Sequence, residues 1–398
     1  MTDSLLSVLR ERPRLAELAA FPFNFDLARA DHGEEVVLVS GASLEPIAGD
    51  DTGGTYFLCD GTAVLYASSE GEAGLLGESV TDALEILIGL PGWWDVLHPD
   101  ADAREAVQLP YAPELDTMRA ELRAGLGLPE RSPEELLARL HGTLLRTEPG
   151  YVLLNAEEGL AYELLDDLPR PTLREQVLAA GLPDKPELGE LPDEGDEFGW
   201  VAVAARAGLT AEARIRLIRL LDDTGPDAVR LRRIVEGLEA VGDPGHAARA
   251  QRLFLSLQDT ALARGAASRI LARLERLAGD HAAARRALDR AVTALDAPPL
   301  PPSVPPVPGQ EELGLGLPEP VGDTSAQGWR RRGTGRMVAE EFLRLALAEA
   351  EAGRARQARE ALDEARALLD GMTGPNGDLG DLSRRAAWAV QALPRTTV

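Results

Sequence analysis

Five acidic residues beside the first apolar runs of the chain form the clearest group that could do chemistry. Asp50, Asp51, Asp60, Glu70 and Glu72 lie in or next to short turns rich in glycine. Carboxylates gathered at one edge of a hairpin could hold a divalent cation, but Asp-Asp-Thr-Gly-Gly lacks the alternating oxygen ligands and terminal glutamate of a calcium loop. A tight turn accounts for the same residues without a metal. We therefore predict no metal ion at this place.

Other candidate ligands and nucleophiles are scattered along the sequence. The single cysteine, Cys59, lies in an apolar run and is interpreted as a small buried side chain, which excludes an intramolecular disulfide. No two histidines have the i, i+4 spacing of a zinc pair. Serine-nucleophile elbows, phosphate-binding loops and dinucleotide fingerprints are missing from the sequence. The sequence thus predicts no catalytic residues and no cofactor, and an enzyme with an unrecognised site is kept as a third hypothesis.

Aromatic residues near the acidic turns favour a surface that binds a partner. Tyr56 and Tyr66 lie on two predicted strands, and Trp93 and Trp94 are adjacent in the chain. In an extended segment the two tryptophans would point in opposite directions, so one could be exposed as a binding hot spot. Alternatively, both seal the end of a helix against the sheet. The predicted partner-binding residues are Asp50, Asp51, Tyr56, Asp60, Tyr66, Glu70, Trp93 and Trp94.

Charge is distributed unevenly over the 398 residues, whose net charge is −25. Residues 1–200 contain 40 acidic against 13 basic residues, a balance of −27, and residues 201–398 contain 26 against 28, a balance of +2. Such an acidic first half argues against binding of nucleic acid or an anionic membrane. It suits a basic protein partner, although acidic residues also serve solubility. The oligomeric state is left open.

The sequence shows no signal for a membrane or for export. No run of 18 apolar residues is present, and the first residues lack the apolar core of a signal peptide. We therefore expect a cytoplasmic protein.

Mixed periodicity in residues 1–180 predicts an α+β domain with a small, mostly antiparallel sheet. Asp60-Gly61 between two apolar runs indicates a hairpin, and Ser79 and Ser132 are expected to cap helices. The predicted strands are 35–40, 55–60, 62–67, 151–155 and 160–165. The last two are expected to form a second hairpin, with a helix over 157–166 as the alternative. The predicted helices are 2–20, broken at Pro13, and 79–90, 113–125 and 132–146.

The second half of the chain repeats itself. A glycine is followed five residues later by an alanine at 208/213, 242/247, 279/284 and 353/358, in steps of 34, 37 and 74 residues. Residues 278–296 and 352–370 share 10 of 19 residues. A period near 34 is typical of stacked helical hairpins. We predict a linker at 181–197 and an all-α helical-hairpin solenoid at 198–398. Its last helix is expected to turn Trp388 inward, and a proline-rich disordered loop is expected at 297–335.

Both halves resemble known families. Residues 44–87 resemble the SUKH (Smi/Knr-like) superfamily through Pro46-Ile47, the acidic-glycine turn at 50–54, the aromatic strand at 56–58, the strand at 64–66, and Ser79 before a helix. That resemblance implies an α+β domain without a catalytic site, which binds another protein and often a toxin. The glycine and alanine positions of residues 200–393 resemble tetratricopeptide repeats, without the aromatic signature of that family.

Taken together, these features predict a non-catalytic protein-binding protein. The SUKH resemblance implies an immunity or regulatory protein whose acidic first domain binds a basic effector such as a toxin. The alternative is a scaffold or signalling adaptor that binds its partner through the helical repeats.

Overall fold

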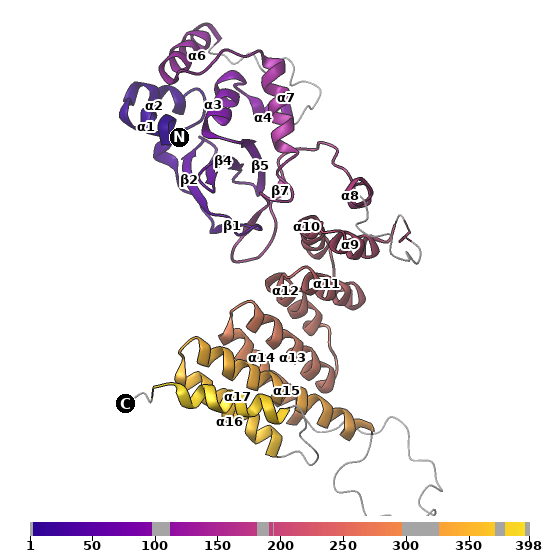
Figure 1. The fold of residues 1–398 in the computed structure, drawn as a ribbon. Coiled ribbons are helices and arrows are strands. Elements are labelled where there is room, and N and C mark those ends of the chain that lie inside the picture. Colours follow the sequence, from indigo (N-terminus) through magenta and orange to yellow (C-terminus); the bar gives the residue numbers. More distant parts are fainter. Residues whose placement is uncertain are drawn as a thin grey trace, which may run out of the picture. The chain divides into compact units, whose positions relative to one another are not determined.

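The computed structural model describes residues 3–97, 112–180, 191–193, 195–296, 326–370 and 379–394. Contacts divide the chain into two compact units, Met1–Asp223 and Thr224–Val398 (Figure 1). The first contains the β-sheets, and the described part of the second is helical. The predicted order, a mostly antiparallel sheet domain followed by helices, is therefore confirmed.

A five-stranded sheet forms the centre of the first unit, in the order β2-β3-β4-β5-β7. The strands β2 to β5 pair antiparallel, and β7 lies parallel to β5. A second sheet pairs β1 with β6. The strands are β1 (Val36–Leu38), β2 (Leu44–Gly49), β3 (Thr55–Cys59), β4 (Ala63–Ala67), β5 (Glu72–Gly77), β6 (Leu153–Asn155) and β7 (Glu163–Leu164).

Of the two hairpins that were predicted from turn residues, one is present and the other is not. Asp60 and Gly61 have φ of 47° and 69°, so both take the left-handed conformation expected between β3 and β4. The second predicted hairpin is wrong, because β6 and β7 enter different sheets. Only an isolated bridge between Leu154 and Ala161 remains of it.

Alternation along the strands sorts apolar side chains into two cores. Tyr56 and Leu58 of β3 face a core shared with the helices, whereas Phe57 and Cys59 face the core shared with β1 and β6. Cys59 is buried as predicted, and burial raises the pKa of its thiol to about 12. The helices preceding α8 are α1 (Asp3–Glu11), α2 (Pro13–Ala20), η1 (Leu27–Arg29), α3 (Val80–Gly89), α4 (Trp93–Leu97), α6 (Ala112–Leu126) and α7 (Pro133–Leu144).

Three further helices belong to the first unit: α8 (Leu173–Ala180), α9 (Glu197–Arg206) and α10 (Thr210–Asp222). Arg219 of α10 donates to the carbonyl of Tyr162 at 2.7 Å, and the Ala161 N–H donates to Asp222 at 3.3 Å. The division of the structure therefore falls after α10, later in the chain than the linker predicted at 181–197. Of that linker, residues 181–190 and 194 lie outside the described residues.

The described helices of the second unit pack in pairs, α11 on α12, α13 on α14 and α15 on α16, and α17 packs on the last pair. Three glycines within these pairs have positive φ: Gly242 (77°), Gly279 (86°) and Gly353 (73°). In the first unit, Gly208 has a φ of 86°. Each takes the left-handed turn that ends a helix. The helices are α11 (Ala228–Ala240), α12 (Pro244–Ser256), α13 (Ala261–Leu277), α14 (His281–Asp296), α15 (Ala326–Glu351), α16 (Ala355–Asp370) and α17 (Leu379–Ala392).

Ion pairs connect each helix pair of the second unit with the next. Arg273 of α13 contacts Glu239 of α11 at 2.6 Å. Arg276 of α13 contacts Glu341 of α15 at 3.2 Å, and Arg285 of α14 contacts Glu364 of α16 at 3.4 Å. Charged side chains thus bridge successive pairs beside the apolar contacts.

Two expectations for the second half are wrong. Helix α15 begins at Ala326, so residues 326–335 are helical; 297–325 lie outside the described residues. Trp388 is 75% exposed. Helix α17 buries Ala386 and Val390, and Trp388 lies two residues from each of them. Two residues are more than half a helical turn, which places Trp388 on the opposite face.

Candidate protein-binding face

Asp50 organises the turn between β2 and β3. Its buried carboxylate accepts hydrogen bonds from the Thr52 N–H at 2.9 Å, the Thr52 hydroxyl at 2.9 Å and the Gly54 N–H at 2.7 Å. The other carboxylate oxygen accepts from the Tyr66 hydroxyl at 2.6 Å. Asp50 is therefore a structural residue that fixes the turn and is not available to a partner.

The turns at one end of the sheet bring two of the predicted acidic residues close together. The Ser69 hydroxyl donates to the Thr52 carbonyl at 3.2 Å, so the β2–β3 and β4–β5 turns lie side by side. These turns expose Asp51 and Glu70. Asp60 lies at the other end of β3, where Cys59 pairs with Ala63. The expectation that these carboxylates gather at one edge is therefore only partly correct.

Further carboxylates join Asp51 and Glu70 at this end of the sheet. Glu72 at the start of β5 pairs with Glu163 at the start of β7. The Tyr162 hydroxyl donates to Glu34 at 2.9 Å, and the Thr55 hydroxyl donates to the Asp31 carbonyl at 3.2 Å. We name this group the acidic end; its residues are Asp31, Glu34, Asp51, Glu70, Glu72 and Glu163.

Most of the aromatic residues predicted to contact a partner lie inside the protein. Tyr56 and Trp93 are 1% and 7% exposed, and Trp94 is half-buried. The Tyr66 ring packs edge-on against Trp93 and Trp94 at centroid distances of 5.3 and 5.6 Å. Burial raises the pKa of the Tyr66 hydroxyl, as does its hydrogen bond to Asp50. These aromatic residues fix α4 against the sheet, so Tyr56, Tyr66 and Trp93 cannot form an exposed binding surface.

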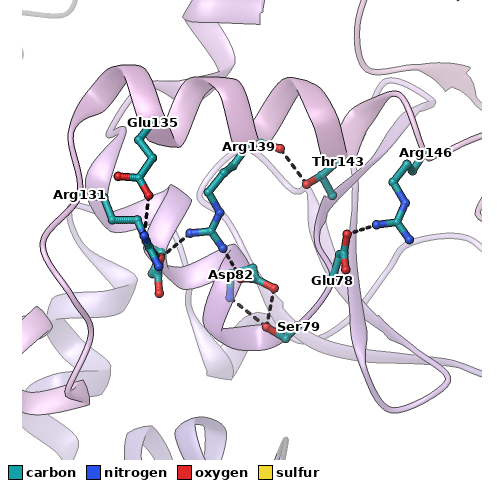
Figure 2. A network of polar contacts seen from close by, with 9 residues as sticks. Glu78, Ser79, Asp82, Arg131, Glu135, Arg139, Thr143 and Arg146 are labelled. Carbon is teal, nitrogen blue, oxygen red and sulfur yellow. Dashed lines mark hydrogen bonds and ion pairs between the residues drawn. The ribbon is translucent and has the colours of Figure 1, made fainter.

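Several arginines elsewhere in the first unit form ion pairs with carboxylates. In Figure 2, Arg131 and Arg139 converge on helix α3, where Arg139 contacts Glu85 at 2.6 Å and also pairs with Asp82. Arg131 contacts Glu85 and, at 2.5 Å, Glu135. The same holds for Arg14 with Glu121, Arg29 with Asp26, Arg146 with Glu78, Arg170 with Asp166, and Arg219 with Glu148.

The acidic end lacks such compensation. Within the described residues, its six carboxylates take part in no ion pair. All of them except Glu72, which is half-buried, are on exposed residues. A surface of this kind attracts cations and cationic proteins through its electric field.

A cleft of about 830 Å³ inside the first unit is lined by segments 145–149, 170–176 and 197–219. Two ion pairs lie in its lining, Arg219 with Glu148 at 3.4 Å and Arg216 with Glu197, and the Arg174 guanidinium lies 6.0 Å from the centre of the Trp200 ring. Glu175 accepts from the N–H and hydroxyl of Thr172, which lowers its pKa. Leu145, Leu173 and Ile215 add apolar side chains to this lining, a mixture that is usual for ligand pockets.

The sequence did not point to Asp31, Glu34 or Glu163 of the acidic end, nor to His32 beside them. Glu163 reaches the acidic end only through the parallel pairing of β7 with β5, for which the sequence carries no local signal.

Among the described residues, no cluster of three or more histidine, cysteine or carboxylate side chains could hold a metal ion. None of the described helices has the length and apolar character needed to cross a bilayer. No family model, curated protein or solved structure matches this chain.

Proposed function

We propose that the protein is a non-catalytic binding protein whose acidic end captures a basic protein. The observation that carries this proposal is the contrast between paired and unpaired charges in the first unit. Arginines beside α3 and α7 are held by carboxylates, whereas the six carboxylates of the acidic end take part in no ion pair within the described residues. The partner would supply the missing cations.

The finer form of the proposal is an immunity or regulatory protein of the cytoplasm that occludes a basic effector such as a toxin. Its support is the resemblance of residues 44–87 to the SUKH superfamily, together with the charge balance of residues 1–200. Of the predicted partner-binding residues, Asp51 and Glu70 remain in the proposed surface. Asp60 lies at the opposite end of the sheet and becomes a control position.

A second candidate is a scaffold that binds through its helices. The packed pairs α11–α12, α13–α14 and α15–α16, with ion pairs between successive pairs, support a helical-hairpin solenoid. The side chain of Trp388 on α17 is 75% exposed. Tryptophans are enriched among the residues that contribute most to binding at protein–protein interfaces. A Trp388→Ala variant that loses the partner, with Asp51→Asn/Glu70→Gln retaining it, would favour this candidate.

Charge removal at the acidic end is expected to slow capture of a basic protein. Asp51→Asn/Glu70→Gln removes two charges from the acidic end, and the matched control Glu45→Gln/Asp60→Asn removes two from the opposite end of the sheet. For hexa-arginine as a basic probe, we expect the first variant to reduce the association rate roughly 3- to 10-fold at low salt and less at high salt. Stopped-flow fluorescence measures the rate. Equal effects of both variants would show that only net charge matters.

A further inference from the structure

His32 sits in the middle of a chain of hydrogen bonds at the acidic end. Its Nδ1 lies 3.1 Å from the hydroxyl of Thr55 on β3, and its Nε2 lies 3.1 Å from the hydroxyl of Tyr162. The Thr55 hydroxyl also contacts the Asp31 carbonyl, and the Tyr162 hydroxyl contacts Glu34 at 2.9 Å. The imidazole therefore connects β3 with a carboxylate of the acidic end.

Counting hydrogens shows that this chain of contacts needs one proton more than a neutral imidazole supplies. The carbonyl of Asp31 and the carboxylate of Glu34 can only accept, so the hydroxyls of Thr55 and Tyr162 must donate to them. Both hydroxyls then have to accept from His32. Only the imidazolium carries a hydrogen on both ring nitrogens. With neutral His32 and ionised Glu34, one of the four hydrogen bonds is lost.

Tyr162 has a single hydrogen to donate, on its phenolic oxygen, so it cannot supply the missing one. It is 7% exposed, and burial raises the pKa of its hydroxyl, as does the hydrogen bond to Glu34. The single phenolic hydrogen points either to Glu34 or to Nε2 of His32. When it points to His32, Glu34 keeps the hydrogen bond from the Asn155 amide at 2.9 Å.

The charged groups around His32 have opposing effects. Burial lowers the pKa of the imidazole, and the carboxylates of Glu34 and Asp31, in that order, raise it. The other residues that contact the imidazole are uncharged: Thr55 and Phe57 lie on β3, and Tyr162 lies just before β7. Glu34 is thus the group that most favours the protonated ring.

We propose that His32 makes the acidic end responsive to pH, because a proton on its imidazole and a basic protein on the surface compete for the same carboxylate, Glu34. This inference rests on the proposed function. A cation that pairs with Glu34 removes the main support of the imidazolium, and the imidazolium in turn neutralises Glu34. Linkage makes the two effects equal in free energy. The affinity for a basic partner therefore falls as the medium is acidified through the pKa of His32.

Nuclear magnetic resonance tests the coupling without any partner. The ring C–H resonance of His32, assigned by its loss in His32→Gln, is followed through a pH titration. Glu34→Gln is expected to lower the pKa of His32, and Asp31→Asn to lower it less. Glu45→Gln, on β2 at the other end of the sheet, is the control and leaves the pKa unchanged. A pKa that does not respond to Glu34→Gln overturns the inference.

Binding of hexa-arginine to the full chain tests the competition. Between about pH 7.5 and about pH 5, in the range where histidine titrates, we expect the affinity of the wild type to fall about two- to fivefold more than that of His32→Gln. Circular dichroism at both pH values verifies that each variant is folded. The same pH dependence in wild type and His32→Gln contradicts this inference alone. Failure of the wild type to bind at either pH contradicts the proposed function and this inference with it.

Discussion

Glu85→Gln is expected to lower the free energy of unfolding of the first unit by about 2–3 kcal/mol. The Glu85 side chain is 6% exposed and accepts from both Arg131 and Arg139 (Figure 2). Removing one member of a buried ion pair usually costs about 3–5 kcal/mol. The cost is smaller here because both guanidinium groups are partly exposed and keep Glu135 and Asp82 as partners. Thermal unfolding followed by circular dichroism should show a decrease of about 5–10 °C.

The matched control for this substitution is Glu135→Gln in the same network. Glu135 also contacts Arg131, but its side chain is 49% exposed. Pairs of this kind contribute about 0–1 kcal/mol, since water solvates both charges. We therefore expect a small change in the midpoint of unfolding. Equal losses for the two variants would mean that burial of Glu85 does not govern the energetics of this network.

Asp50→Ala is expected to destabilise the first unit by about 3 kcal/mol. The substitution leaves the N–H groups of Thr52 and Gly54 and the hydroxyl of Tyr66 without their acceptor. A buried donor without a partner costs about 1–3 kcal/mol, and the turn can relax to reduce part of this cost. Equilibrium unfolding in urea measures the loss as a lower midpoint.

Asp51→Ala provides the comparison at the neighbouring position. Asp51 is exposed and accepts no hydrogen bond in the described network of the turn, so we expect a change within about 0.5 kcal/mol. The two substitutions remove the same chemical group from adjacent residues. If Asp51→Ala destabilised the protein as much as Asp50→Ala, loss of charge in the turn would explain both results and the hydrogen bonds of Asp50 would not.

Local features of the fold could be predicted from the sequence. Ser79 and Ser132 cap α3 and α7 as expected, by accepting from the N–H groups of Asp82 and Glu135. Asp60-Gly61 forms its hairpin, and the glycine that ends α13, Gly279, takes a left-handed conformation. Each of these features depends on residues within one turn of the chain, so the residue type nearly determines the conformation.

Long-range pairing could not be predicted in the same way. Segment 151–165 has the composition of a hairpin, but β6 pairs with β1 and β7 pairs with β5, more than 80 residues earlier in the sequence. The candidate site depends on these pairings, because they bring Glu163 beside Glu72. Burial of Tyr66 against Trp93 is likewise tertiary, and it turned expected contact residues into core.

The ion pairs between helix pairs of the second unit bear on its cooperativity. Arg276 and Arg285 lie in α13 and α14, and the carboxylates that they contact lie in α15 and α16. Loss of α15 and α16 would leave Arg276 without the carboxylate of Glu341 and Arg285 with Asp289 alone, and would expose the apolar residues beside them. Partial unravelling from the carboxyl terminus is therefore costly, and the helices of this unit are expected to melt together as denaturant is added.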